Sequence, residues 1–408
     1  MTVRVQIGFD MTLTDPVNFM ILDDPVQGAL DDIYVLGGNT LVDVTDSVRE
    51  VSTRRGRSQQ LGTFTGAAQV VLNNMDRAFD PVNAASPYFG SIIPMKQLVI
   101  DDDGVPIWTG FVDDWNFDYA PNGISMATCA GIDGFVLFAP RTLDEGAQVA
   151  EPAGTRIDRV LDLLGWTASQ RDVSVGQVAL DADYVVAGTN ALAYMQKAAG
   201  SDPGALFMSR AGVVTFRDRA DQQQFSSSAT FSDVSGSATI PFTAISVGYG
   251  AETLMNTASV SYVSGSVVAG VGESASAASQ TLFGKKEQQY ATLLGDALDA
   301  TALAEWLVAQ YASPRYTVSQ LTVDLLALAA TQQGIIRALE LGDVVLVEWT
   351  PNNVGDPVSE YLVVNSIAHS VTASPRRHSV TIGTSKTSAA FILDDDHFGI
   401  LDTSTLGF

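Results

Sequence analysis

The chain has 408 residues, of which 46% are hydrophobic and 17% are charged. This composition is typical of a folded protein with a sizeable core, and the length predicts two or three domains. The formal net charge of -24 argues against nucleic acid as a stable ligand, because phosphate binding requires clustered Lys and Arg side chains. An acidic surface suits a passage through which DNA slides without sticking, but it is also an ordinary property of soluble proteins.

No stretch approaches the roughly 18 apolar residues of a membrane span, and the first residues lack the pattern of a signal peptide. We therefore expect synthesis and folding in the cytoplasm. The single cysteine, Cys129, has no partner for an intrachain disulfide. Its place in an alternating segment predicts a small core residue on a strand.

The first third of the chain has the alternation of β-strands. Val3, Val5 and Ile7 share one face of the first predicted strand, and residues 101–104 form a good hairpin turn between two apolar runs. Similar patterns continue to about residue 139. We predict a β-barrel or sandwich over residues 1–145, with an N-terminal arm at about residues 10–38.

A small α+β domain is predicted next, over residues 150–225. Thr155 is the expected cap of a first helix that ends at Gly165, and a second helix follows Thr189. Two strand patterns then flank the turn at residues 209–212, which predicts a hairpin.

Strand patterns return in a second barrel-type domain, predicted over residues 240–390 with one helix near residues 299–312. Residues 226–238 are rich in Ser and Ala and are interpreted as a linker into this domain. Residues 264–280 are small and have little to bury, so we expect a mobile or partner-ordered loop there.

A short segment occurs twice, once near each end of the chain. Ile21-Leu22-Asp23-Asp24 is followed by Gly28 and Leu30, and the same residue types recur at the same spacing from Ile392. We interpret the copies as arms, the second at residues 391–408, that pack either on their own domain or on a neighbouring subunit. The candidate interface residues in these arms are Ile21, Leu22, Leu30, Ile392, Leu393, Phe398, Leu401 and Leu406.

Three arginines, Arg54, Arg55 and Arg57, interrupt the acidic background where a hairpin or bend is expected. They belong either to a solvated loop or to a contact with an acidic neighbouring subunit, and they complete the set of candidate interface residues.

Motifs of catalysis are absent from the sequence. It contains no G-x-S-x-G, H-E-x-x-H, C-x-x-C or Walker loop, and the spacing of His369, His378 and His397 matches no metal-ligand pattern. We therefore expect no enzyme activity, no cofactor and no metal.

Several stretches, in this order and spacing, resemble minor tail proteins of phages that infect actinobacteria, a siphophage family of tail-tip and baseplate hub proteins. The resemblance covers nearly the whole chain except the loop that begins at Ser264. The stretches are Asp43-Val44-Thr45-Asp46-Ser47-Val48, residues 53–58, Asn73-Asn74-Met75-Asp76-Arg77-Ala78-Phe79-Asp80-Pro81, Trp108-Thr109-Gly110-Phe111-Val112-Asp113, Gly165-Trp166, Arg171-Asp172-Val173, Phe216-Arg217-Asp218-Arg219 and Leu341-Gly342-Asp343.

The resemblance implies a mainly β fold in which two related β-barrel tube-type domains line a channel and a small α+β domain is inserted between them. Three chains would form a pseudo-sixfold ring at the tail tip of the virion. Expected partners are a distal tail protein ring, the tape-measure protein, other tail-tip or receptor-binding proteins, and DNA in transit during ejection. The net charge of -24 predicts acidic side chains along the bore of such a ring.

Two alternatives remain open from the sequence. A distal tail protein would also be rich in β structure but would form a hexameric ring. A tip protein that binds or hydrolyses cell-wall glycans would use exposed aromatic side chains such as Trp115.

Overall fold

The computed structural model describes most of the chain between residues 3 and 386. The described ranges are 3–9, 41–57, 63–221 and 226–386, without the single residues 235, 237, 252 and 266. Both predicted arms, and with them all eight of their candidate interface residues, lie outside these ranges. Strands hold 45% of the residues and helices 21%, so the expected mainly β class is confirmed.

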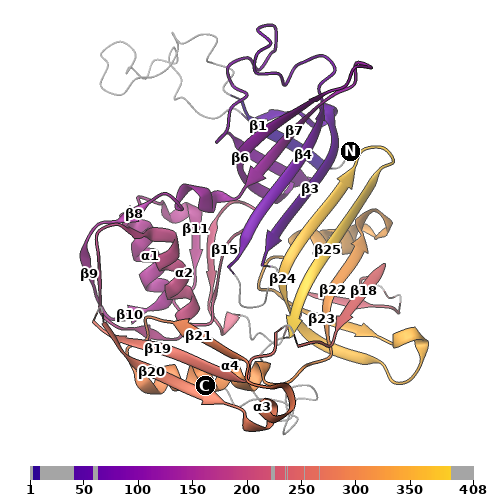
Figure 1. Cartoon of the computed structure of the whole chain (residues 1–408). Coiled ribbons are helices and arrows are strands. Elements are labelled where there is room, and N and C mark those ends of the chain that lie inside the picture. Colours follow the sequence, from indigo (N-terminus) through magenta and orange to yellow (C-terminus); the bar gives the residue numbers. More distant parts are fainter. Residues whose placement is uncertain are drawn as a thin grey trace.

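A first β region forms the upper end of the molecule in Figure 1. Its strand order is β3-β4-β7-β6-β5-β1-β2, and its core includes Val5, Leu72, Ile100 and Trp108. The strands are β1 (Val3–Gly8), β2 (Leu41–Asp43), β3 (Val48–Gly56), β4 (Thr65–Asn73), β5 (Gln97–Asp102), β6 (Val105–Tyr119) and β7 (Ser125–Ile132).

The hairpin expected at residues 101–104 is confirmed, since it joins β5 to β6. Asp103 and Gly104 both have positive φ values, 56° and 79°, as a two-residue hairpin turn requires. The expected position of Cys129 is also confirmed, because it lies on β7 and is fully buried.

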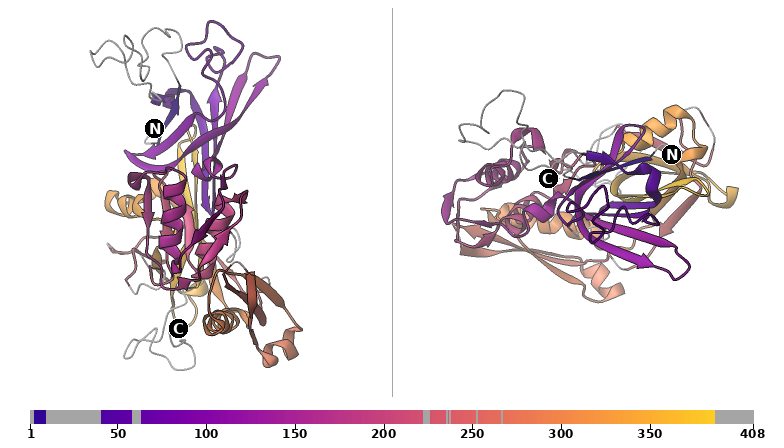
Figure 2. Two further views of the ribbon diagram at one scale, coloured as in Figure 1. Left: turned by 90° about the vertical axis from the view of Figure 1, so that its left-hand side faces the viewer. Right: turned by 90° about the horizontal axis from the view of Figure 1, so that it is seen from above.

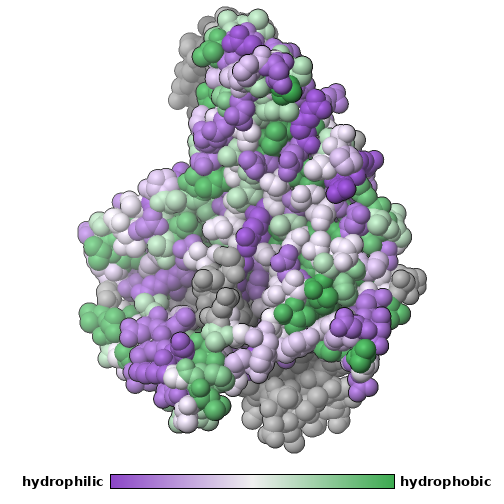
Figure 3. Space-filling model, turned by 45° about the vertical axis from the view of Figure 1, so that its right-hand side comes forward, coloured by the Kyte–Doolittle hydropathy of each residue, from purple (hydrophilic) through white to green (hydrophobic). Residues whose placement is uncertain are grey.

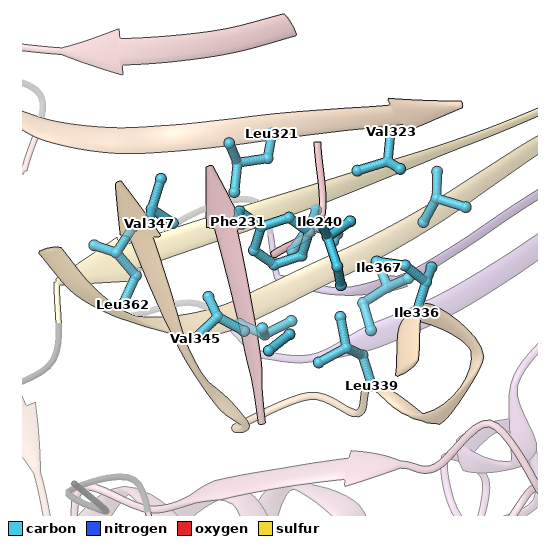
Figure 4. Packing of buried hydrophobic residues seen from close by; sticks show 14 of the residues in the cluster. Phe231, Ile240, Leu321, Val323, Ile336, Leu339, Val345, Val347, Leu362 and Ile367 are labelled. Atoms are coloured by element: carbon cyan, nitrogen blue, oxygen red, sulfur yellow. The ribbon is translucent and has the colours of Figure 1, made fainter. Parts of the chain in front are cut away.

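A second β region has the order β18-β22-β25-β24-β23-β17. Figure 4 shows its core, where Phe231, Leu321, Val345 and Ile367 point toward one another from different strands. Its elements are β17 (Ala229–Ser232), β18 (Ala244–Gly248), β22 (Thr317–Asp324), α5 (Ala330–Ala338), β23 (Val344–Trp349), β24 (Val358–Thr372) and β25 (Arg377–Lys386).

The two β regions share one 13-stranded sheet, because β24 pairs with β3. The pairing is antiparallel and extends from Ser366 opposite Gly56 to Thr372 opposite Glu50. The 15 residues of β24 serve both cores, since Leu362 lies in the second core and Val371 in the first. The two regions are therefore joined by a continuous sheet, although each has its own core.

An α+β unit packs beside the sheet in Figures 1 and 2 around a third core, which includes Ile157, Met195 and Phe216. Its elements are β8 (Thr142–Leu143), β9 (Gly146–Gln148), β10 (Glu151–Pro152), α1 (Ala153–Leu163), β11 (Arg171–Val173), β12 (Ala179–Leu180), β13 (Asp183–Val185), β14 (Thr189–Asn190), α2 (Ala191–Ser201), β15 (Ala205–Met208) and β16 (Val214–Arg217). The predicted hairpin is confirmed as β15 and β16, which pair antiparallel.

The caps of the two helices differ from the predicted ones. Thr155 lies inside α1, which begins two residues earlier after Pro152, so Thr155 does not cap it. Pro152 precedes the helix with an extended ψ of 152°, and no side chain caps this end. For α2 the cap is Asn190 rather than Thr189, and its side chain accepts a hydrogen bond from the Ala193 N–H at 2.8 Å.

A fourth unit contains the predicted loop at residues 264–280, and that prediction is wrong. Most of the segment forms β20 and α3, beside β19 in a separate three-stranded sheet covered by α4. Small residues suit this place because a Cβ at Gly272 would come within 2.4 Å of the Thr301 backbone nitrogen in α4. The elements are β19 (Thr257–Ser264), β20 (Val267–Ala275), α3 (Ala277–Phe283), β21 (Glu287–Ala291) and α4 (Ala297–Tyr311). The last of these confirms the helix expected near residues 299–312.

The Ser-rich segment at residues 226–238 is not a simple linker. It contains β17, which pairs in parallel with β23 and places Phe231 in the second core with no exposed surface. One aromatic side chain among small polar residues is enough to anchor this strand, because a buried Phe contributes about 2 kcal/mol. No helix in the described ranges is both long and apolar enough to cross a membrane.

Candidate functional site

The arginine segment lies at the joint between the two β regions, where β3 meets β24. Arg54 and Arg55 lie in β3, whereas Arg57 follows its last residue, Gly56. β3 and β4 pair antiparallel from Gly56 opposite Thr65, so the expected hairpin begins at the end of this segment and not within it. Its strand neighbours, β4 and β24, satisfy its main-chain hydrogen bonds on both sides. The alternation of β3 then sends successive arginine side chains to opposite faces of the sheet.

Arg55 points inward and is used inside the chain. Its Nη1 makes an ion pair with Glu340, and its Nε donates to the Ile107 carbonyl oxygen at 3.3 Å. The same carboxylate also accepts from the backbone N–H of Arg210 at 3.0 Å. Glu340 therefore ties β3, the β15–β16 turn and the start of β23 together.

Arg57 is also held within the chain. Its Nε and Nη2 donate to the side-chain oxygen of Asn365 at 3.0 and 2.8 Å, and its guanidinium lies 4.8 Å from the centre of the Phe64 ring. Burial lowers the pKa of Arg57 to about 10, while the nearby Tyr311 hydroxyl acts in the opposite direction. The side chain remains charged at neutral pH.

Arg54 is the exposed member of the three. It lies on the outer face of the sheet, opposite Ala368 on β24 and Ala67 on β4. A contact with an acidic neighbouring subunit thus stays a prediction, and Arg54 is the arginine whose position suits it.

The outer face around Arg54 carries mostly small or polar side chains. Across β22, β25, β24, β3 and β4 it presents the side chains of Thr322, Thr381, Ala368, Ser370, Ser52 and Gln69. An open hollow of about 440 Å³ lies over Arg54, Gln69 and Ser370. Figure 3 views the molecule partly from the side of β24 and β25 and shows a largely pale area of intermediate hydropathy there.

Beneath the joint lies a buried polar network that sequence reasoning missed. Arg337 on α5 makes an ion pair with Asp102 on β5, with Nε and Oδ2 2.6 Å apart. His378 Nδ1 is 3.8 Å from the same carboxylate oxygen, and its Nε2 lies 3.0 Å from Nδ1 of His369. The network joins the first β region to α5, β24 and β25.

Both histidines of this network are held in the neutral form. Burial lowers the pKa of His369 well below its usual range, and the adjacent His378 adds to the effect. Burial also lowers the pKa of His378, although the Asp102 carboxylate opposes this shift. No local signal in the sequence could reveal the network, since Arg337 and Asp102 are 235 positions apart.

The described residues offer little for chemistry. Among them, no group of three or more His, Cys, Asp or Glu side chains is placed to hold a metal ion. Burial raises the pKa of the Cys129 thiol to about 12, which makes it a poor nucleophile.

Trp115 is not the exposed aromatic side chain that a glycan-binding surface was expected to use. It is half-buried, and its ring stacks on Phe117 with the centroids 6.3 Å apart. Phe9 and Phe79 stack on it at 6.4 Å each. Trp115 therefore belongs to the aromatic packing of the first core.

Comparisons with known proteins place the fold. No family model matches the sequence, and no curated protein matches it. Among solved structures, the chain is similar to the 43 kDa tail protein of prophage MuSo2 from Shewanella oneidensis, with a TM-score of 0.57, 14% identity, and coverage of 86% of this chain and 95% of that one. It is also similar to a tail protein from Neisseria meningitidis MC58, with a TM-score of 0.59, 8% identity, and coverage of 94% and 96%. The chain thus has the fold of phage tail proteins.

Proposed function

We propose that this chain is a structural protein of a long-tailed phage, a hub-type component at the end of the tail tube, and not an enzyme. The observation that carries the proposal is one sheet that runs through two β regions of like strand order and presents an outer face of small and polar side chains. The fold of two tail proteins, found over 86% and 94% of the chain, supports it.

In this proposal the two β regions are β-barrel domains with the α+β unit, residues 150–225, inserted between them. Hydrogen bonds around the second region support a barrel. The Ile240 N–H donates to the Thr230 carbonyl oxygen on β17 at 2.8 Å, and three residues later the Thr243 N–H donates to Thr322 on β22 at 2.7 Å. One segment thus bridges the two sides of that region, as closure requires.

Three copies would form a ring whose bore is lined by the outer face of the shared sheet. On that face, between β22 and β6 in the strand order, the acidic residues are Glu50, Asp114, Asp118 and Asp324, and the basic ones are Arg54 and Arg377. The proposed bore is therefore polar with a small acidic excess, less acidic than the net charge of the chain led us to expect. Small uncharged side chains keep such a surface free of strong contacts with passing DNA.

The proposed ring sits in the virion at the tail tip and connects the distal tail protein ring, the end of the tape-measure protein and the receptor-binding tip proteins. It opens to let DNA pass during ejection. The two terminal arms, residues 10–38 and 391–408, are proposed to contact neighbouring subunits, together with Arg54.

The test is the copy number of this chain in purified virions, from a symmetry-resolved cryo-EM reconstruction of the tail tip. Three copies at the end of the tube are expected for the hub. Six copies would assign the chain to the distal tail ring instead, and absence from the particle would end the structural proposal.

A further inference from the structure

The two β regions repeat one strand plan. In the first, the order is β3-β4-β7-β6-β5-β1, and in the second it is β18-β22-β25-β24-β23-β17. The strands take these places in the same sequence order. All the pairs agree in direction except the last, which is antiparallel in β1–β5 and parallel in β17–β23. The chain therefore contains an internal structural duplication.

The register of the long strands fixes which residues are equivalent. β6 and β24 both have 15 residues, and each skips one residue in its pairing, after Val112 in β6 and after Val364 in β24. Just before β5, the Lys96 carbonyl oxygen accepts from Val112 N–H at 2.7 Å. Before β23, the Asp343 carbonyl oxygen accepts from Val364 N–H at 2.9 Å.

The residues just before Lys96 and Asp343 also share the same backbone conformation and hydrogen bond. Met95 and Gly342 both have positive φ values, 64° and 89°, and both donate their N–H to the carbonyl oxygen of Val112 or Val364. A non-glycine residue with positive φ is uncommon, so its recurrence at the same place supports the alignment.

Counting from the skipped residue, Asp118 on β6 is equivalent to Ser370 on β24. The next strands extend the match, since Gln69 on β4 and Gln320 on β22 occupy equivalent places. Ser52 on β3 lies opposite Gln69, and Ser246 on β18 lies opposite Gln320. Ser52 and Ser246 are therefore equivalent.

The two regions differ in what covers their edges. Inside the chain, the second half of β24 is covered by β3, with Ser370 opposite Ser52. The equivalent half of β6, residues 113–119, pairs with β7 on one side, and no described strand lies on its other side. β18 likewise has β22 on one side and no described strand on the other. In Figure 1, β6 lies in the upper β region and β18 at the lower right, and six strands separate them in the order of the shared sheet.

We infer that, in a ring of copies, the second half of β6 of one copy pairs with β18 of the next copy and so repeats the internal β24–β3 joint. This inference rests on the proposed ring. In it, Asp118 lies opposite the next copy's Ser246, as Ser370 lies opposite Ser52.

The directions of the strands permit this joint. From β18 to β6 the eight neighbouring strands alternate in direction, so β6 and β18 run opposite to each other, as β24 and β3 do. A head-to-tail contact of this kind closes into a ring when its rotation matches the number of copies. The open main-chain groups of both edges would then be paired.

The side chains of β6 and β18 are also compatible with the proposed joint. Asp113, Asp114 and Asp118 protect the open edge of β6 from wrong pairing before assembly, because charges on edge strands disfavour chance contacts. Ala244 and Ser246 of β18 carry no charge. The joint thus brings no like charges together.

The test is disulfide cross-linking in the full-length chain that carries Asp118→Cys and Ser246→Cys. Cys129 is buried and stays in place. The matched control carries Ser52→Cys and Ser370→Cys, the equivalent pair inside one chain. Residues directly opposite in antiparallel strands have Cβ atoms about 5 Å apart, close enough for a disulfide after a small adjustment.

After mild oxidation we expect a covalent trimer as the main species of the test variant on a non-reducing gel, and a cross-linked monomer for the control. A mixture of the two single-cysteine variants should stop at dimers. If the control cross-links but the test variant remains uncrosslinked, whether monomeric or assembled in native mass spectrometry, the β6–β18 joint is overturned. The tail function is judged separately by the copy number in virions.

Discussion

The two β regions share a strand plan but differ at one edge. The half of β24 that β3 covers carries uncharged side chains, whereas the equivalent half of β6 is acidic. The matched positions are Asn365 and Asp113, Ser366 and Asp114, and Ser370 and Asp118. The difference teaches that charge at these places depends on coverage within the monomer and not on the fold, since both halves keep the same register.

The two β regions also differ in the length of chain inserted between equivalent strands. Between β3 and β4 the chain uses only residues 57–64, but between the equivalent β18 and β22 it inserts the whole unit of β19, β20, β21, α3 and α4. The insertion leaves the strand order unchanged. Surface connections tolerate such growth because they do not interrupt the hydrogen bonds of the sheet.

The largest expected effect comes from breaking the buried ion pair that couples the regions. Arg337→Met leaves the Asp102 carboxylate buried without its partner, which should lower the free energy of unfolding by about 4 kcal/mol in urea titrations. The control is Arg4→Met, which removes a pair with Asp101 at 2.8 Å whose arginine is 48% exposed. The control should cost much less. Equal losses would mean that Arg337 does not couple the regions.

The second effect concerns the β3–β24 joint. Gly56 has a φ of +127°, and a Cβ there would lie 2.2 Å from the Asn365 carbonyl oxygen. Gly56→Ala should therefore cost about 3 kcal/mol, from strain and overpacking together. In Gly104→Ala, where φ is +79° and nothing lies within 4 Å of the new Cβ, the cost should be about 1 kcal/mol. A Gly56 variant no less stable than the Gly104 variant would show that the joint can relax.

The third prediction concerns the pH dependence of stability that the pair His369 and His378 causes. The first region has no such pair, since Phe117 is equivalent to His369. Both histidines have a lowered pKa in the folded state, so below about pH 6.5 the unfolded state binds protons that the folded state does not. Stability should then fall as pH falls below about 6.5, by at most about 1.4 kcal/mol per pH unit for each histidine.

Other groups around the pair affect the size of this slope. The charged groups near the two rings are Asp102, Arg337, Arg55, Asp324 and Arg376. Asp133 and Asp202 oppose the trend, because burial raises the pKa of each to about 6 and the folded state takes up their protons first. The double variant His369→Gln with His378→Gln isolates the effect. If its urea midpoint falls with pH as steeply as that of the wild type, the histidines are not the cause.

The smallest expected effect tests whether an acid is tolerated at a covered joint. Ser370→Asp copies Asp118 of the first region into the β24–β3 joint. Because this side chain lies on the exposed outer face, the free energy of unfolding should change by no more than about 0.5 kcal/mol. The reverse exchange, Asp118→Ser, is the control. A loss above about 2 kcal/mol in Ser370→Asp would count against an acidic residue in the proposed β6–β18 joint.

Sequence periodicity predicted what local contacts decide. The first strands, the β5–β6 turn, the β15–β16 hairpin and α4 follow from alternation, turn residues and helical spacing. The exposed strand β20 and the buried β17 were misjudged, since their small residues give little signal and their partner strands decide their structure. α5 was not foreseen, because its only large apolar residues, Ile335 and Ile336, are adjacent and do not repeat at helical spacing.

The candidate site was foreseen only as a cluster of arginines. Its place in the sheet depends on β24, which follows β3 by about 300 residues, beyond the reach of any local pattern. The duplication was hidden as well. The equivalent segments Gln69-Val70-Val71-Leu72-Asn73 and Gln320-Leu321-Thr322-Val323-Asp324 share only one glutamine and a pattern of apolar residues, and the register is needed to align them.

The late arrival of β24 has a consequence for synthesis on the ribosome. One edge of β3 waits for a partner while about 300 further residues are translated, which takes roughly 15 to 60 s at bacterial rates. During that time the nascent chain exposes an open strand that could associate with other chains. During this time the charged Arg49, Glu50 and Arg54 of β3 disfavour aggregation through its open edge. They do so before β24 pairs with β3 in the folded protein.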